Sequence, residues 1–163
     1  MTSFTAEEAW QELPGEKTES VFLAGLPEGA KAADDALMRT FEKLFVVRSA
    51  VQGLLETARR EKLIGASLEA RVVLYAGGEL KSFLQQHLAD LPAYFIVSQV
   101  ELVDTAPEGA QPLSLGTAFP SGATLSAKIE RARGNKCPRC WAFSEAVGKT
   151  APVCEKCQAA LAG

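Results

Sequence analysis

Residues 136–141 read Lys-Cys-Pro-Arg-Cys-Trp, and residues 154–157 read Cys-Glu-Lys-Cys. These stretches hold all four cysteines of the 163-residue chain, namely Cys137, Cys140, Cys154 and Cys157. Two pairs with this spacing supply the four thiolates of a tetrahedral structural zinc site. The loop between them, residues 141–153, has 13 residues, slightly fewer than the usual 15–20 or so. We expect one structural zinc ion with four cysteine ligands; disulfides or a redox pair are the alternative.

The rest of the composition favours the metal. A chain of this length fits one ordinary domain or two small ones. No N-terminal run has the form of a signal peptide, and no stretch approaches the roughly 20 apolar residues of a membrane span. We therefore expect a cytoplasmic protein without a membrane partner, where thiols stay reduced and paired cysteines indicate metal.

The net charge of −3 hides an asymmetry. Residues 128–163 carry +4, which leaves −7 for residues 1–127. A zinc ion held by four thiolates has a formal charge of −2, so the cations of this tail either offset the metal site or contact phosphates. Both interpretations stay open for these cations: Lys128, Arg131, Arg133, Lys136, Arg139, Lys149 and Lys156.

Two helices are predicted in the first 65 residues. The first begins near Phe4, with Thr5 as N-cap and Glu8 closing a capping box, and ends at Pro14-Gly15. The second spans residues 34–61 and is stopped by Gly65. We expect its apolar stripe to be only partly covered. The residues at helical spacing are Leu37, Met38, Phe41, Leu44, Phe45, Val51, Leu54, Leu55 and Ala58.

A small α/β unit is predicted next. Residues 71–75 read as a strand, and a helix follows Gly77-Gly78 until Pro92 breaks it. A second strand region covers 94–103, and residues 104–123 read as a loop. An alternating strand over 124–133 leads into the first cysteine pair; we call the pairs Cys137/Cys140 and Cys154/Cys157 the first and second knuckle. The predicted fold class is α+β: a helical segment (1–65), an α/β unit of the strand–helix–strand–strand kind (66–135) and a four-cysteine zinc finger (136–163).

The first knuckle also holds two side chains suited to RNA. Zinc fixes the backbone there, so Trp141 can stack on an unpaired base while Arg139 contacts a base edge or a phosphate. Alternatively, Trp141 caps the small core of the finger. No catalytic residues are predicted, because a zinc ion with four cysteine ligands has no open position for water. The residues alone indicate a binding module.

Several blocks resemble, in order, the C-terminal end of bacterial isoleucyl-tRNA synthetases. They are Phe4-Thr-Ala-Glu-Glu-Ala-Trp10, Leu13-Pro14-Gly15, Val47-Arg48, Leu55-Glu56-x-Ala58-Arg59, Ile64-Gly65-x-Ser67-Leu68-Glu69-Ala70 and Lys136-Cys-Pro-Arg-Cys-Trp141. The resemblance implies the end of an anticodon-binding helical domain, then a junction, then a zinc module that docks the anticodon arm of the isoleucine tRNA. It implies one zinc ion on the four cysteines, with Arg139 and Trp141 approaching the anticodon. With RNA as the partner, we expect the tail cations to contact phosphates.

The catalytic and editing parts of that family are missing from this sequence. No HIGH-type or KMSKS-type ATP signature occurs, so we expect a fragment or one piece of a split enzyme, with ATP used only by the full-length enzyme and the catalytic portion as a partner. Two alternatives are a zinc-stabilised protein-interaction module and the zinc-finger end of a formamidopyrimidine-type DNA glycosylase. The glycosylase reading is disfavoured because Thr2 and Ser3 replace its N-terminal Pro and Glu; DNA is therefore not an expected partner.

Overall fold

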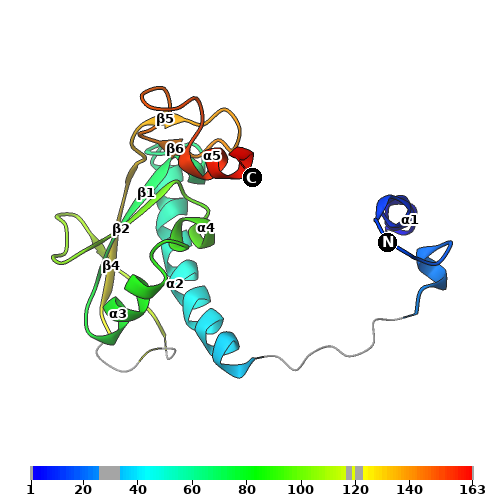
Figure 1. Ribbon diagram of the computed structural model, residues 1–163. Coiled ribbons are helices and arrows are strands. Elements are labelled where there is room, and N and C mark those ends of the chain that lie inside the picture. Colours follow the sequence, from blue (N-terminus) through cyan, green and yellow to red (C-terminus); the bar gives the residue numbers. More distant parts are fainter. Residues whose placement is uncertain (1, 26–33, 117–118, 120–122, 163) are drawn as a thin grey trace. The chain divides into compact units, whose positions relative to one another are not determined.

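The computed structural model describes residues 2–25, 34–116, 119 and 123–162 (Figure 1). The chain forms two compact units, Met1–Asp34 and Asp35–Gly163. The domain boundaries predicted at residues 65 and 135 follow the family's domains. The division into compact units does not test them, so they remain predictions. Among the described helices, none has the length and apolar character needed to cross a membrane.

The first unit pairs helix α1 (Ser3–Glu12) with the short 3-10 helix η1 (Val21–Leu23). Glu7 accepts hydrogen bonds from Gln11 and Ser20, both at 2.8 Å, and these bonds lower the pKa of its carboxyl group. The predicted N-cap at Thr5 is wrong: the helix begins two residues earlier, and Thr2 at the cap position makes no side-chain capping bond. The predicted end is confirmed, because the helix stops before Pro14.

Helix α2 (Asp35–Arg60) confirms the predicted long helix. It ends in a left-handed turn, in which Lys62 has φ 59° and the N–H of Leu63 donates to the carbonyl of Ala58 at 2.9 Å. This geometry satisfies the last carbonyls of the helix. Gly65 does not stop the helix as predicted; it lies beyond the turn and donates its N–H to Glu69 at 2.8 Å.

A four-stranded sheet in the order β2-β1-β4-β3 follows. Its strands are β1 (Ala70–Ala76), β2 (Gln99–Val103), β3 (Gln111–Pro112) and β4 (Leu125–Arg131). Strand β1 runs parallel to β2 and antiparallel to β4. The 3-10 helix η2 (Ser67–Glu69) precedes β1, and the crossover from β1 to β2 contains α3 (Glu79–Gln86) and α4 (Leu91–Phe95).

Three predictions in this unit need correction. Pro92 lies in the first turn of α4, where its missing N–H costs nothing, instead of breaking the preceding helix. Strand β2 begins at Gln99 and not at residue 94, because α4 and a left-handed Ile96 (φ 59°) occupy that segment. The predicted loop 104–123 contains strand β3; its residues 117–118 and 120–122 lie outside the described part.

Helices α2, α3 and α4 cover one face of the sheet (Figure 1). A single apolar core joins α2, α3 and α4 to alternate residues of β1 and β4, among them Val47, Val51, Leu55, Val72 and Ala127. The first turns of α2 contribute less: Met38 is 50% exposed and Phe45 54%. The α2 stripe is therefore only partly covered, as the sequence predicts.

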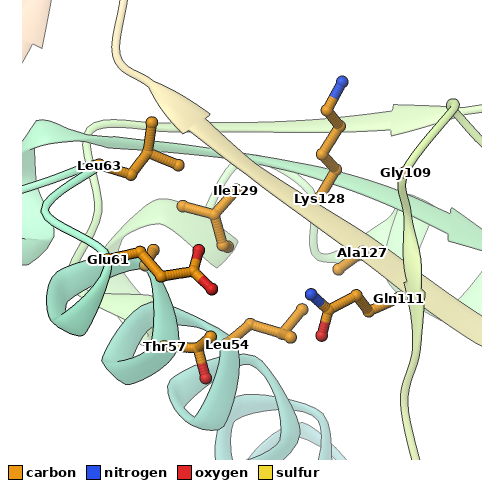
Figure 2. A pocket seen from close by; sticks show the side chains of 10 residues that line it. Leu54, Thr57, Glu61, Leu63, Gly109, Gln111, Ala127, Lys128 and Ile129 are labelled. Atoms are coloured by element: carbon orange, nitrogen blue, oxygen red, sulfur yellow. The ribbon is translucent and has the colours of Figure 1, made fainter.

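A shallow cavity of about 170 Å³ remains between the C-terminal half of α2 and strand β4 (Figure 2). Leu54 and Ile129 line it, while Glu61 and Gln111 add polar atoms. This cavity is a packing gap at the helix–sheet interface, and we assign no function to it.

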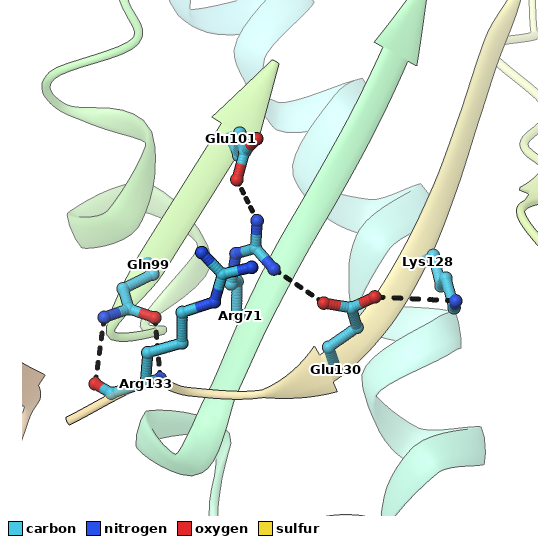
Figure 3. Close-up of polar contacts among 6 residues, drawn as sticks. All are labelled: Arg71, Gln99, Glu101, Lys128, Glu130 and Arg133. Carbon is cyan, nitrogen blue, oxygen red and sulfur yellow. Dashed lines mark hydrogen bonds and ion pairs between the residues drawn. The ribbon is translucent and has the colours of Figure 1, made fainter. Parts of the chain in front are cut away.

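The opposite face of the sheet carries an ion-pair network (Figure 3). Arg71 on β1 has only 8% of its side chain exposed and pairs with Glu101 on β2 and with Glu130 on β4, the latter at 2.6 Å. Lys128 adds a contact of 3.5 Å to Glu130. One buried guanidinium thus bridges three adjacent strands, and its charge is balanced on both sides.

We predict that Leu55→Ala lowers the free energy of unfolding by about 2–5 kcal/mol, because it leaves a cavity where α2 meets the sheet. Met38→Ala, on an exposed turn of the same helix, should change it by about 0.5 kcal/mol or less. Urea unfolding followed by circular dichroism measures both. Equal losses for the two variants would contradict the core described above.

Candidate metal centre and its exposed knuckle

The four cysteines converge on one point. Their Sγ atoms all lie within 4.8 Å of one another. Cys137, Cys154 and Cys157 are buried, and Cys140 is half-buried. The 13-residue loop between the two cysteine pairs is long enough, because a short two-stranded ribbon and the C-terminal helix bring the pairs together.

The donor set and its geometry fit zinc. A tetrahedron with Zn–S bonds of about 2.3 Å has S···S edges of about 3.8 Å, close to the 3.5 Å between the Sγ atoms of Cys140 and Cys154. That separation far exceeds a disulfide bond of about 2.05 Å, and all four cysteines are free thiols. The four sulfurs are positioned to bind one metal ion, and a complete thiolate tetrahedron makes it a structural site.

The first knuckle is held by a short ribbon, β5 (Asn135–Lys136) paired with β6 (Phe143–Ser144). Within it, the N–H of Trp141 donates to the carbonyl of Cys137 at 2.9 Å, and the N–H of Cys137 donates to Ala142 at 2.8 Å. These bonds close the tight turn that brings Cys137 and Cys140 together.

The second knuckle uses the start of helix α5 (Glu155–Ala162). Cys154 precedes the helix, and its carbonyl accepts the first helical hydrogen bond from Gln158 at 2.9 Å. The Cys154 thiol thus stands at the N-cap position of the helix, where the backbone N–H of Cys157 acts against the burial that raises the pKa of this thiol. Helix geometry then places Cys157 beside it.

The sulfurs sit in unequal environments. Backbone N–H groups, first that of Cys140, lower the pKa of the Cys137 thiol to about 6. Burial raises the pKa of the Cys154 thiol to about 12. A divalent cation would overcome that burial penalty, because it replaces the protons of all four thiols at once.

The finger has almost no apolar core of its own. Its buried cluster consists of the cysteines and Val147, with Val153 packed against it. So small a cluster cannot offset the conformational entropy of about 30 ordered residues, so the metal must supply the folding free energy.

The finger is joined to the sheet by side-chain hydrogen bonds that the sequence analysis did not predict. The amide of Gln99 donates to the carbonyl of Arg133 at 3.1 Å and accepts the N–H of the same residue at 2.9 Å (Figure 3). The hydroxyl of Ser98 accepts the N–H of Phe143 at 2.7 Å and donates to the carbonyl of Leu68. We call these contacts of Ser98 and Gln99 the seam.

Gly134 explains how closely the start of the finger approaches the finger's own strand β6. Its φ is +88°, and a Cβ there would lie 2.2 Å from the carbonyl oxygen of Ser144. Only glycine fits this position. A glycine between a strand and a CxxC pair is a sequence signal that could have located this close approach.

Trp141 is 62% exposed and lies outside the finger's core. Its backbone is left-handed, with φ 68°, a conformation that costs a non-glycine residue about 1–3 kcal/mol. The ammonium of Lys136 lies 5.6 Å from the centre of the indole ring. The alternative that Trp141 caps the core is therefore wrong.

The other predicted tail residues separate into groups. The Arg139 guanidinium donates to the Sγ of Cys157 at 3.5 Å, which raises the pKa of Arg139. Arg133 is held through its backbone by Gln99. Within residues 123–162, which the structure describes without a gap, four cations are exposed and make no side-chain hydrogen bond, ion pair or ring contact: Arg131, Arg133, Lys149 and Lys156.

Two segments of the chain match known protein families. Residues 1–74 match the anticodon-binding domain of tRNA ligase. Residues 134–160 match the zinc finger found in FPG and IleRS. The finger alone would leave the glycosylase alternative open, whereas the first segment belongs to tRNA ligases.

Similar proteins cover nearly the whole chain. The isoleucine–tRNA ligase of Syntrophotalea carbinolica is 42% identical over 98% of the chain. Those of Desulforudis audaxviator and Symbiobacterium thermophilum are 40% and 41% identical over 99% and 95% of it. The chain spans only 17% of the length of each of these relatives.

We predict that Cys137→Ser or Cys154→Ser unfolds residues 136–162, because each removes a ligand from a module that folds on its metal. In an amide NMR spectrum those residues should lose dispersion, while signals from β1 and β4 serve as the internal control. A zinc chelator should have the same effect on the unsubstituted chain. Dispersed finger signals after zinc removal would contradict this prediction.

The order of the two family segments agrees with the residue blocks quoted for the resemblance. The anticodon-binding segment comes first and the finger last, and the identity to bacterial relatives extends across the α/β unit between them. The chain belongs to the isoleucyl-tRNA synthetase family and corresponds to the C-terminal region of its bacterial members.

Proposed function

We propose that this chain is the tRNA-binding C-terminal portion of an isoleucine–tRNA ligase and that it docks the anticodon arm of the isoleucine tRNA. The observation that carries the proposal is Trp141, an exposed indole on a metal-held turn beside Lys136. A large apolar ring kept in water at a conformational cost supports stacking on an unpaired base.

The predicted RNA contacts divide by chemistry. Trp141 would stack on a base, and Lys136 would reach a neighbouring phosphate from the same edge. The exposed cations Arg131, Arg133, Lys149 and Lys156 would contact the RNA backbone. Arg139 donates one N–H to Cys157, and its remaining donors can face RNA.

The wider assignments rest on the relatives' names. A full-length enzyme would attach isoleucine to tRNA with ATP, using a catalytic portion that would be the partner of this chain, in the cytoplasm and without DNA or a membrane. We propose residues 1–65 as the end of the anticodon-binding helical domain, 66–135 as the junction and 136–163 as the zinc finger. The zinc ion is structural here and takes no part in chemistry.

The test is a binding titration of the zinc-loaded chain with isoleucine tRNA and with a second tRNA. Tighter binding of the isoleucine tRNA, lost on zinc removal, is expected. Equal binding of both would reject the specificity, and no binding of either would favour a protein-interaction module.

We predict that Trp141→Ala weakens binding of isoleucine tRNA by about 1–3 kcal/mol, the usual contribution of a stacked base. Trp141→Phe keeps an aromatic face and should retain much of the affinity. Zinc content is measured on both proteins. Unchanged affinity of a zinc-loaded Trp141→Ala variant would rule out stacking.

Lys149→Gln and Lys156→Gln should each weaken binding of both tRNAs to the same extent, because phosphate contacts carry no sequence information. The slope of log affinity against log salt should fall by roughly 1 for each lysine that contacts a phosphate. Titrations at three salt concentrations measure it. A change in preference between the tRNAs would instead place the lysine at a base.

A further inference from the structure

Four thiolates around one divalent cation leave an excess negative charge of −2 in a partly buried site. Such charge is stabilised by hydrogen bonds to the sulfurs, and loss of a group that hydrogen-bonds to a metal ligand typically costs about 10–100-fold in metal affinity. The donors to each sulfur are therefore expected to contribute to metal retention.

Backbone groups serve two of the sulfurs. Cys137 accepts the backbone N–H of Cys154, with 3.4 Å between nitrogen and sulfur, and backbone N–H groups around it lower the pKa of its thiol. Burial raises the pKa of the Cys154 thiol, and the backbone N–H of Cys157 acts against that rise. These donors come with the turns themselves, so no side-chain substitution removes them.

Cys157 is served differently. Its Sγ accepts a hydrogen bond from the guanidinium of Arg139, 18 positions earlier in the chain. Within residues 134–162, all of them described, Arg139 is the only cationic side chain in contact with a sulfur. Lys136 lies over Trp141 instead, and Lys156 makes no such contact.

The second knuckle offers a matched comparison for Arg139. Arg139 stands between Cys137 and Cys140, and Lys156 stands at the same place between Cys154 and Cys157. Both side chains belong to exposed residues. Only the arginine turns back toward the metal site, where it links the first knuckle to a ligand of the second.

We propose that Arg139 is a positioning residue of the zinc centre, which retains the metal by donating a hydrogen bond to the Cys157 thiolate and offsetting its charge. The guanidinium suits this role because its charge is permanent and its donors are arranged in a rigid fork. The proposal concerns the metal alone and holds whether or not the chain binds RNA.

The test compares zinc-loaded Arg139→Gln with Lys156→Gln in the full chain. Zinc affinity is measured by competition with a colorimetric chelator, and Arg139→Gln should lower it by roughly tenfold or more. Lys156→Gln removes the same charge from the equivalent position and should leave it nearly unchanged. Equal affinities for the two variants would overturn the proposal.

A second measurement separates this contact from general loosening of the finger. Iodoacetamide is added to each zinc-loaded protein, and mass spectrometry gives the alkylation rate at each cysteine. Arg139→Gln should speed alkylation of Cys157 more than that of Cys137, because only Cys157 loses a donor. Equal acceleration at all four cysteines would indicate a merely structural effect and overturn the proposal.

Amide spectra in saturating zinc show whether Arg139→Gln folds. If it does not, Arg139→Lys replaces it, since the lysine keeps the charge but lacks the fork. Alkylation of Cys157 should then still be accelerated more than that of Cys137, with a smaller difference between the two. The absence of this difference would overturn the proposal.

Discussion

The convergence of four sulfurs within 4.8 Å is the constraint on which the C-terminal part of this protein depends. Four thiolates at that spacing repel one another, and burial of the Cys154 sulfur opposes its ionisation. The surrounding apolar cluster, with Val147 and Val153, is too small to hold them. A divalent cation turns this repulsion into a net attraction, and the turns, the ribbon and α5 can then exist as a folded module.

The finger can present side chains to a partner only if its orientation on the α/β unit is defined, and the seam defines that orientation. Gln99 and Ser98 of the sheet region hold backbone groups of Arg133 and Phe143. Gly134, which follows Arg133, lets the chain pass close to Ser144 as it enters the finger. The metal fixes the shape of the knuckle, and the seam fixes its place on the α/β unit. An indole that protrudes from such a turn is presented to a partner at little further entropic cost.

Local patterns predicted well what local forces produce. The long helix and the β4 strand follow from spacing and alternation, because each depends on neighbours a few residues away. The cysteine ligands follow from the spacing within each pair, although 13 residues separate the two pairs. The wrong predictions concern residues whose local pattern is compatible with two different structures. Pro92 both ends and begins helices, and Gly65 resembled a helix stop although Lys62 took the left-handed position. Intrinsic helix propensity cannot decide such cases, because tertiary packing offsets the conformational cost of a strained residue at one position and not at another.

The sequence by itself determined the metal ligands, the order of the segments and the family, because spacing and residue type carry that information along the chain. Only the tertiary structure decided which side chains around the metal serve it and which face outward. Arg139 and Trp141 flank the same cysteine, yet one contacts Cys157 and the other remains 62% exposed. The reason is that a contact across 18 positions and a left-handed backbone at Trp141 both arise from the closed knuckles, which exist only once the four sulfurs have met.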